Sequence, residues 1–213
     1  DLRDRADVFS GVLARCYWPV SVGNGKSKPE VVLGNLVSRN YFEVLGVKPL
    51  LGRAFSTTEG NVEGADPVVV LSHRFWKRRL AANPDVVGRT LLLNSRTFTV
   101  IGVAPEGFTG LMTGIPEDVW IPITMKAGVH PGDIPLESRG DGWMDVVARL
   151  KDGVSLPQAQ AAVKTLAFHL AQEYPDANKN KQFVLVDGQL SRFPVMELAQ
   201  GVRAFTAILT IVV

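Results

Sequence analysis

The sequence predicts an α+β fold of two lobes, in which a mostly-β lobe is inserted into a β-α-β lobe. Three observations lead to this class. A strand pattern, a helix pattern and a second strand pattern follow one another between residues 144 and 186. Two hairpin patterns lie before them, each with a short polar turn. The composition is that of a folded chain, because 46% of the 213 residues are hydrophobic, 21% are charged and the net charge is only +2.

The β-α-β pattern is the clearest local unit. Residues 144–150 predict a strand, which a turn connects to a helix over residues 155–174. Ser155 and Gln158 have the spacing of a capping box at the start of that helix. Residues 182–186 predict the returning strand, which completes a β-α-β unit.

One aromatic side chain of this helix lies away from its apolar stripe. The stripe consists of Ala159, Ala162, Val163, Leu166 and Leu170. Phe168 lies roughly 180° from the centre of the stripe at 100° per residue. Phe168 is therefore either exposed or packed against another element, such as a partner protein.

The remaining strands are predicted from two hairpins and one apolar run. Residues 8–38 predict a hairpin whose turn is the polar cluster Gly23–Pro29. Residues 90–103 predict a second hairpin around the two-residue turn Asn94-Ser95. Residues 67–71 form an unbroken apolar run, which is typical of a strand buried on both faces.

One glycine-rich segment has a partial likeness to a phosphate-binding loop. It reads Gly23-Asn24-Gly25-Lys26-Ser27, but a Walker loop needs a glycine at the position that Val20 occupies. The sequence after it does not open a helix, so the helix N-terminus that would hold the anion is missing. We interpret the segment as a hairpin turn and expect no nucleotide site in the chain.

The titratable residues do not predict a catalytic or metal site. The histidines His73, His130 and His169 lack the spacing of zinc ligands. Acidic residues such as Glu117 and Asp118 lie in polar stretches, and we interpret them as solvated loop charge rather than as a catalytic pair. We therefore expect no catalytic residue, no metal and no cofactor, and hence a protein that is not an enzyme.

The densest basic cluster lies in a predicted helix over residues 73–82. Arg74, Lys77 and Arg78 share one face of this helix. An amphipathic surface helix explains this pattern without a ligand, and a contact with an acidic partner or lipid headgroups explains it with one. The net charge of +2 does not favour nucleic acid as that partner. We take Arg74, Lys77 and Arg78, together with Phe168, as candidate partner-contact residues.

The last ten residues form an uncharged apolar run that follows Arg203. One alternative is a buried C-terminal strand, since Ile, Val and Thr favour strands. The other is the first half of a membrane helix, which needs about 20 apolar residues to cross a bilayer. We expect the second alternative, in which residues 204–213 begin a transmembrane helix. The side chains expected to anchor it are Phe205, Ile208, Leu209, Ile211, Val212 and Val213.

Several sequence blocks, in this order, resemble a known family. Residues 36–55 read LVSRNYFEVLGVKPLLGRAF, residues 69–76 read VVLSHRFW and residues 98–108 read FTVIGVAPEGF. With residues 88–91 and 118–122, they resemble the MacB-like periplasmic core domain of ABC-type permeases of the MacB/FtsX type. The resemblance covers nearly the whole chain and points to the duplicated-permease branch of that family.

The resemblance implies a non-catalytic domain of a permease in the bacterial inner membrane, facing the periplasm or the cell exterior. Such a domain would couple cytoplasmic ATP hydrolysis to export or release of cargo, by efflux or by mechanotransmission. The implied partners are a cytoplasmic ATP-binding subunit or domain reached through the transmembrane helices, and a second copy or second half of the permease. A periplasmic partner or cargo, and the membrane through flanking segments, are implied as well. The alternatives are a periplasmic adaptor module without transported cargo, and a hydrolase.

The position of the β-α-β unit and the resemblance together predict the lobe boundaries. We expect residues 1–80 and 143–203 to form one porter-like lobe, and residues 81–142 to form the inserted lobe.

Overall fold

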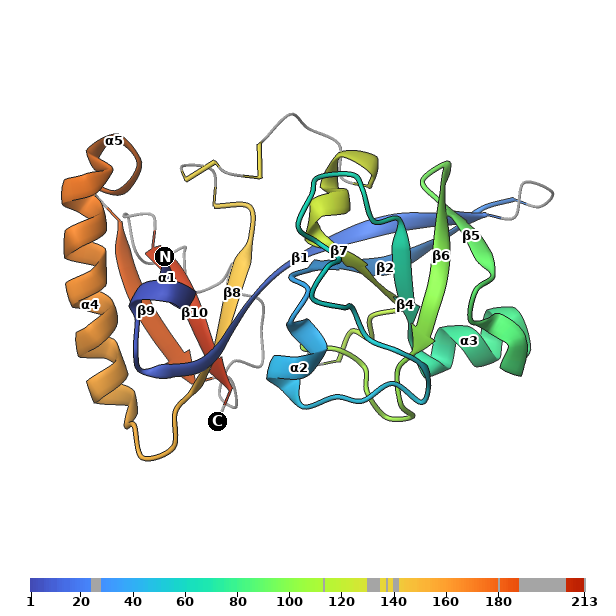
Figure 1. The fold of residues 1–213 in the computed structure, drawn as a ribbon, viewed down its shortest axis with the longest axis horizontal. Coiled ribbons are helices and arrows are strands. Elements are labelled where there is room, and N and C mark those ends of the chain that lie inside the picture. The colour runs from blue at the N-terminus through green and yellow to red at the C-terminus, as the bar shows by residue number, and fades with distance from the viewer. Residues whose placement is uncertain are drawn as a thin grey trace. The chain divides into compact units, whose positions relative to one another are not determined.

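The computed structural model describes residues 1–23, 28–112, 114–129, 135–136, 138–139, 142–179, 181–187 and 206–212. The chain divides into two compact units (Figure 1). Unit 1 combines Asp1–Ala14 with Glu137–Val213, and unit 2 is Arg15–Leu136. Each unit has its own cluster of buried apolar side chains. The predicted class, a mixed fold of helices and strands with one lobe inserted into the other, is confirmed.

The strands of unit 2 pair in a closed ring. The order round the ring is β1 (Phe9–Gly23), β2 (Glu30–Val37), β7 (Val119–Pro122), β4 (Val68–Leu71), β6 (Arg96–Val103) and β5 (Thr90–Leu93), which pairs with β1 again. β1 and β2 pair in antiparallel fashion, with Arg15 opposite Val37 at one end and Val22 opposite Glu30 at the other, as the first predicted hairpin requires. The short strand β3 (Leu51–Gly52) pairs with β6 beside the ring. Each strand of the ring thus has a neighbour on both sides, which removes open sheet edges.

The second predicted hairpin has the turn that its sequence demands. Asn94 and Ser95 both have positive φ, 46° and 68°, as a two-residue turn between twisted strands requires. The side chain of Asn94 accepts a hydrogen bond from the Ser21 amide and donates one to the Val129 carbonyl, each at 2.7 Å. Asn94 therefore serves both the turn and the packing of unit 2.

Short helices connect the strands of unit 2. Helix α2 (Tyr41–Leu45) ends at Gly46, whose φ of 69° is left-handed. Helix α3 (His73–Leu80) begins at Ser72, whose hydroxyl accepts a hydrogen bond from the Phe75 amide at 3.0 Å. Two 3₁₀ helices, Pro84–Val86 and Ile123–Gly128, complete the connections.

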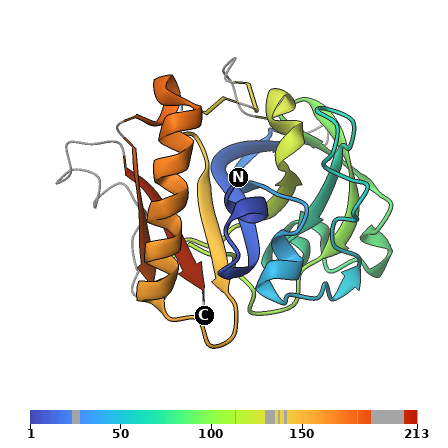
Figure 2. The same ribbon diagram turned by 60° about the vertical axis from the view of Figure 1, so that its left-hand side comes forward.

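Unit 1 contains the predicted β-α-β arrangement. Its strands follow the order β1, β8 (Asp145–Leu150), β10 (Thr206–Val212) and β9 (Gln182–Asp187), and its helices are α1 (Leu2–Arg5), α4 (Leu156–Glu173) and α5 (Pro175–Asn178). Helix α4 lies against β9 in both views (Figures 1 and 2). The side chains that α4 buries are Ala159, Val163, Leu166 and Leu170, four of the five predicted stripe positions. At its start, the Gln158 side chain accepts hydrogen bonds from the Ser155 amide and hydroxyl at 2.9 and 2.8 Å.

The predicted first boundary between the lobes is wrong. We expected residues 1–80 to belong with the β-α-β lobe, but the chain passes to unit 2 after Ala14, inside β1. The physical reason is strand pairing, because β2 completes the ring beside β1 and β4 pairs with β6 and β7. Residues 15–80 are therefore part of the ring and not of unit 1.

The C-terminal segment forms a strand and not the expected helix. β10 lies between β8 and β9 and pairs in parallel with both. Its residues are rich in Ile, Val and Thr, which favour extended backbone. Of the expected anchor residues, Ile208, Leu209, Ile211 and Val212 lie in β10, and Phe205 and Val213 lie outside the described residues. Among the helices of the described ranges, none combines the length and the apolar character needed to cross a bilayer.

Ending the chain at Arg203 removes β10 and tests this strand. β8 and β9 each pair with β10 and are not neighbours in the sheet, so we expect β9 to lose its hydrogen-bonded partner. The melting temperature should then fall by more than about 5 °C in differential scanning calorimetry. A chain that ends at Val212 keeps β10 and is the matched control. An unchanged melting temperature for the chain ending at Arg203 would contradict the strand and favour the membrane-helix alternative.

Candidate functional site

The basic residues predicted as partner contacts line one pocket of unit 2. Arg74, Lys77 and Arg78 of α3 form one wall of a cavity of about 510 Å³. Residues 106–109, from the loop between β6 and β7, form the other wall, and His73 lies at the start of α3. The structure thus brings together the three cationic side chains that helical spacing places on one face.

A buried carboxylate, Asp118, lies beside the two arginines of this pocket. Arg74 Nη2 donates to Asp118 Oδ1 at 2.7 Å, and Arg78 Nη2 lies 3.9 Å from Asp118 Oδ2. The Asp118 side chain is only 5% exposed, whereas Arg74 is 53% exposed. Arg78 also forms an ion pair with Glu30. The buried Asp118 therefore holds the Arg74 guanidinium at the rim of the pocket, and Glu30 is the close partner of Arg78.

The third cation, Lys77, has a looser partner. Its Nζ lies 3.7 Å from Glu106 Oε1, and His73 Nδ1 lies 3.8 Å from the same oxygen. Charge-assisted hydrogen bonds are typically about 2.7–2.9 Å long, so neither contact is a close hydrogen bond. Glu106 is 77% exposed and precedes Gly107, whose φ is +87° with open space around it. Glu106 is therefore a weakly held counterion for Lys77.

The loop that carries Glu106 is held in place by a second buried carboxylate, Glu117. Glu117 Oε1 accepts a hydrogen bond from the Leu111 amide at 2.9 Å. Glu117 Oε2 accepts one from Asn35 Nδ2 at 2.8 Å and another from Trp120 Nε1. The Glu117 amide donates to the Thr109 carbonyl at 2.9 Å. Side chain and backbone of one residue thus bind both ends of a tight turn over residues 109–111.

Aromatic packing holds the same loop from another side. The Phe108 ring lies 5.2 Å from the Trp120 ring, 6.1 Å from Phe42 and 6.5 Å from Tyr41, measured between centroids. Phe42 and Tyr41 belong to α2 and are fully buried. Such tilted and edge-on contacts are the favoured geometries of aromatic pairs.

Burial perturbs the titration of this cluster. Burial raises the pKa of Glu117 above its usual 4.5, against the opposing effects of its hydrogen bonds and of the Arg15 charge. Burial, with the Glu117 charge second, raises the pKa of Tyr41 well above its usual value. Among the described residues, the Tyr41 hydroxyl and Asn35 Oδ1 are buried without a hydrogen-bond partner.

The interpretation of Glu117 and Asp118 as solvated loop charge is wrong. Glu117 is 0% exposed and Asp118 is 4% exposed. Burial of these two side chains depends on Asn35 and Arg74, which lie far away in the chain, so their local sequence gives little sign of it. The only local sign is Gly110, because a glycine with a φ of +92° lets the backbone turn round the Glu117 carboxylate.

Phe168, the fourth candidate contact residue, lies elsewhere. It is 62% exposed on α4, as its position away from the stripe predicts. It belongs to unit 1, whereas α3 belongs to unit 2, so the structure does not unite the four candidates in one pocket. Among the described residues its ring packs edge-on against His169, with the centroids 5.9 Å apart.

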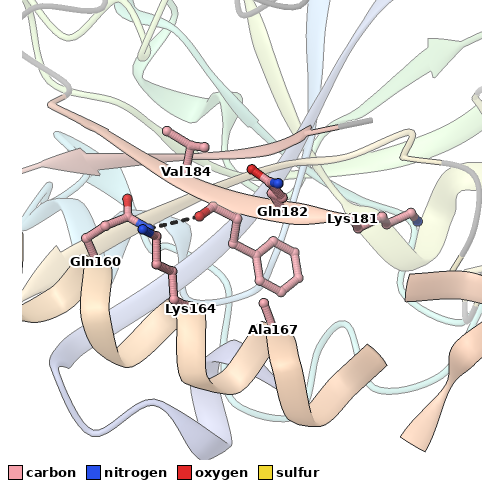
Figure 3. A pocket seen from close by; sticks show the side chains of 7 residues that line it. Gln160, Lys164, Ala167, Lys181, Gln182 and Val184 are labelled. Carbon is pink, nitrogen blue, oxygen red and sulfur yellow. Dashed lines mark hydrogen bonds between the residues drawn. The ribbon is translucent and has the colours of Figure 1, made fainter. Parts of the chain in front are cut away.

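A second pocket lies in unit 1 between α4 and β9 (Figure 3). It measures about 580 Å³ and is lined by Gln160, Lys164, Ala167, Lys181, Gln182, Phe183 and Val184. Gln160 Nε2 donates to the Phe183 carbonyl at 2.9 Å, and Gln160 Oε1 accepts from the Leu185 amide at 2.8 Å. The Gln160 amide thus binds the β9 backbone as a neighbouring strand would.

The described part of the chain contains no cluster of three or more His, Cys, Asp or Glu side chains that could hold a metal ion. His73 lines the basic pocket and His169 packs against Phe168. His130 and residues 24–27 of the glycine-rich turn lie outside the described residues.

Gly110→Ala tests the turn round Glu117. A Cβ at Gly110 would lie 2.1 Å from Glu117 Cδ, on a backbone with φ of +92°. We expect a loss of about 3 kcal/mol or more in the free energy of unfolding, from overpacking and backbone strain together. Gly107→Ala is the matched control, because its φ of +87° is similar but its Cβ meets open space, and it should lose about 1 kcal/mol. Urea unfolding measures both, and equal losses would count against the role of Gly110.

Glu117→Gln tests the buried carboxyl through pH. A raised pKa means that the folded state takes up a proton more readily than the unfolded chain. This contribution to stability is fully present below the usual pKa of 4.5 and is lost as the pH rises through the folded-state pKa. Relative to Glu117→Gln, the unmutated protein should therefore lose stability as the pH rises, by up to about 1.4 kcal/mol per pH unit. Urea unfolding of both proteins from about pH 4 to pH 8 measures this, and parallel curves would show that Glu117 does not titrate as described.

The sequence matches one family model and several named relatives. Residues 1–166 match the MacB-like periplasmic core domain family. The probable export ATP-binding/permease protein MacB of Pseudomonas entomophila (strain L48) is 30% identical over 132 residues. The macrolide export ATP-binding/permease protein MacB of Escherichia coli (strain K12) is 28% identical over 133 residues. Each alignment covers 62% of this chain but only 18% and 19% of the relatives, so the chain spans a small part of their length.

Solved structures share the fold. The periplasmic region of MacB from Actinobacillus actinomycetemcomitans matches with a TM-score of 0.56 at 20% identity, over 81% of this chain and 71% of that one. The extracellular domain of the noncanonic ABC-type transporter YknZ from Gram-positive bacteria matches with a TM-score of 0.58 at 15% identity, over 80% and 79%. Together with the match over residues 1–166, these likenesses show that the chain belongs to the family of MacB-like periplasmic core domains, the family that its sequence blocks resemble.

Proposed function

We propose that this periplasmic core domain transmits the motion driven by cytoplasmic ATP hydrolysis to the export or release of a cargo. In this proposal the domain faces the periplasm or cell exterior from a permease of the bacterial inner membrane. The named relatives are ATP-binding/permease proteins, which supports an ATPase as partner. A second copy or second half of the permease, and membrane attachment through flanking segments, belong to the same proposal.

The observation that carries the proposal is the continuity of β1 between the two units. Residues 9–14 of this strand belong to unit 1 and residues 15–23 to unit 2. In unit 1, Ser10 Oγ donates to the Leu150 carbonyl of β8 at 3.1 Å. In unit 2, residues 15–22 of the same strand pair with β2, from Arg15 opposite Val37 to Val22 opposite Glu30. In this proposal a movement of unit 1 acts on unit 2 through this shared strand, which bends between residues 14 and 15 as the units move.

A second candidate function is a periplasmic adaptor that binds a partner without moving cargo. The basic pocket of α3 favours it, because that pocket offers cationic side chains on the surface. The two functions differ in one respect: an adaptor needs no response to nucleotide.

Spin-label distances in the full-length permease test the coupling. In a Cys16→Ser background, Val62→Cys labels unit 2 and Gln172→Cys labels unit 1, both at exposed positions. We expect the distance distribution between these labels to differ between the nucleotide-free and the ATP-hydrolysing permease. Val31→Cys with Val62→Cys, both exposed on unit 2, is the matched control and should not change. An unchanged distance between the units during active ATP hydrolysis would overturn coupling and favour the adaptor.

A further inference from the structure

We propose that the basic pocket between α3 and the β6–β7 loop binds a carboxylate side chain from an acidic segment of a partner protein. This deepens the proposed function, because it names the chemistry of a partner for the domain. It depends on four side chains: Arg74, Lys77 and Arg78 on one wall and Glu106 on the other.

The arginines are pre-positioned to bind an anion. Arg74 uses Nη2 to bind the buried Asp118, and a guanidinium has five N–H donors in all. Because Asp118 is 5% exposed, this contact restrains Arg74 before any ligand arrives. Pre-ordered side chains lower the entropy cost of binding. Arg74 and Arg78 remain 53% and 47% exposed, so a ligand can reach them.

Glu106 indicates which anion fits. The loop already presents a carboxylate to Lys77 and His73, at 3.7 and 3.8 Å. These contacts are long, and Glu106 is 77% exposed next to the open backbone of Gly107. A carboxylate from another molecule can therefore replace Glu106 beside Lys77 while α3 stays in place. In the unliganded protein, Glu106 competes with such a ligand.

The charge balance favours a protein segment over a membrane. The basic side chains of α3 are interleaved with three acids, Glu30, Glu106 and Asp118. Anionic membranes attract clusters of about 4–8 Lys and Arg, and acids among them weaken that attraction. A pocket of about 510 Å³ that also includes Phe108 and Thr109 suits a side chain with its backbone better than a flat surface.

Fluorescence anisotropy with a labelled hexaglutamate peptide tests the pocket on this chain. Lys77→Gln should weaken binding by about tenfold, and Glu106→Gln should strengthen it by about threefold, because it removes the internal competitor. Arg89→Gln is the matched control: it removes one positive charge at an exposed position of unit 2 outside the pocket, and should change affinity by less than about twofold. Circular dichroism melting checks that all three variants fold. A hexaglutamine peptide should not bind.

Each contrary result overturns the proposal in a recognisable way. Absence of saturable binding below about 1 mM removes the pocket as a carboxylate site. If Lys77→Gln and Arg89→Gln weaken peptide binding equally, the peptide is held by the general positive charge of the surface and not by the pocket. If phosphatidylglycerol vesicles displace the bound peptide, and Lys77→Gln abolishes the vesicle binding, the pocket is a lipid site. The assay uses the domain without nucleotide, so its failure is distinct from a failure of the spin-label test of coupling.

Discussion

The closure of the strand ring through β1 and β2 is the constraint on which unit 2 depends. In this pair Gly34 lies opposite Trp18, and a Cβ at Gly34 would lie 2.4 Å from Val20 Cγ2, so the packing leaves no room for a side chain there. From β2 the ring continues through β7, β4, β6 and β5 back to β1. The ring fixes the ends of β4, β6 and β7, and these ends carry α3 and the β6–β7 loop.

Two successive carboxylates just before β7, Glu117 and Asp118, each hold one wall of the basic pocket. Glu117 binds the backbone of the loop wall through the Leu111 amide. Asp118 holds Arg74 on the helix wall, and its carbonyl accepts from the amide of Ser72, the cap of α3. Both acids are desolvated, which is costly unless hydrogen bonds and opposite charges compensate. The same short segment therefore sets the position of both walls.

Local features of the fold are predictable from the sequence, and features that depend on distant contacts are not. Ser72 as a helix cap and Asn94 in a positive-φ turn follow from the chemistry of single residues. The boundary after Ala14 does not, because it depends on the pairing of β1 with strands that lie far away in the chain, as in the pair of Val22 with Leu93. Burial of Glu117 depends likewise on a distant partner, Asn35. For residues 206–212, strand and membrane helix share one apolar composition, and only the neighbours β8 and β9 distinguish them.

The hydrogen bonds of Gln160 have a consequence for self-association. Within the described part of unit 1, β9 ends the order of strands, and such a strand can recruit a strand from another molecule. The carbonyl of Phe183 and the amide of Leu185 lie on one side of the strand, and the Gln160 side chain occupies both. A second molecule that extended the sheet at this point would first have to displace a side chain anchored on α4. At this point of β9, the Gln160 amide occupies the hydrogen-bonding groups that an added strand would need.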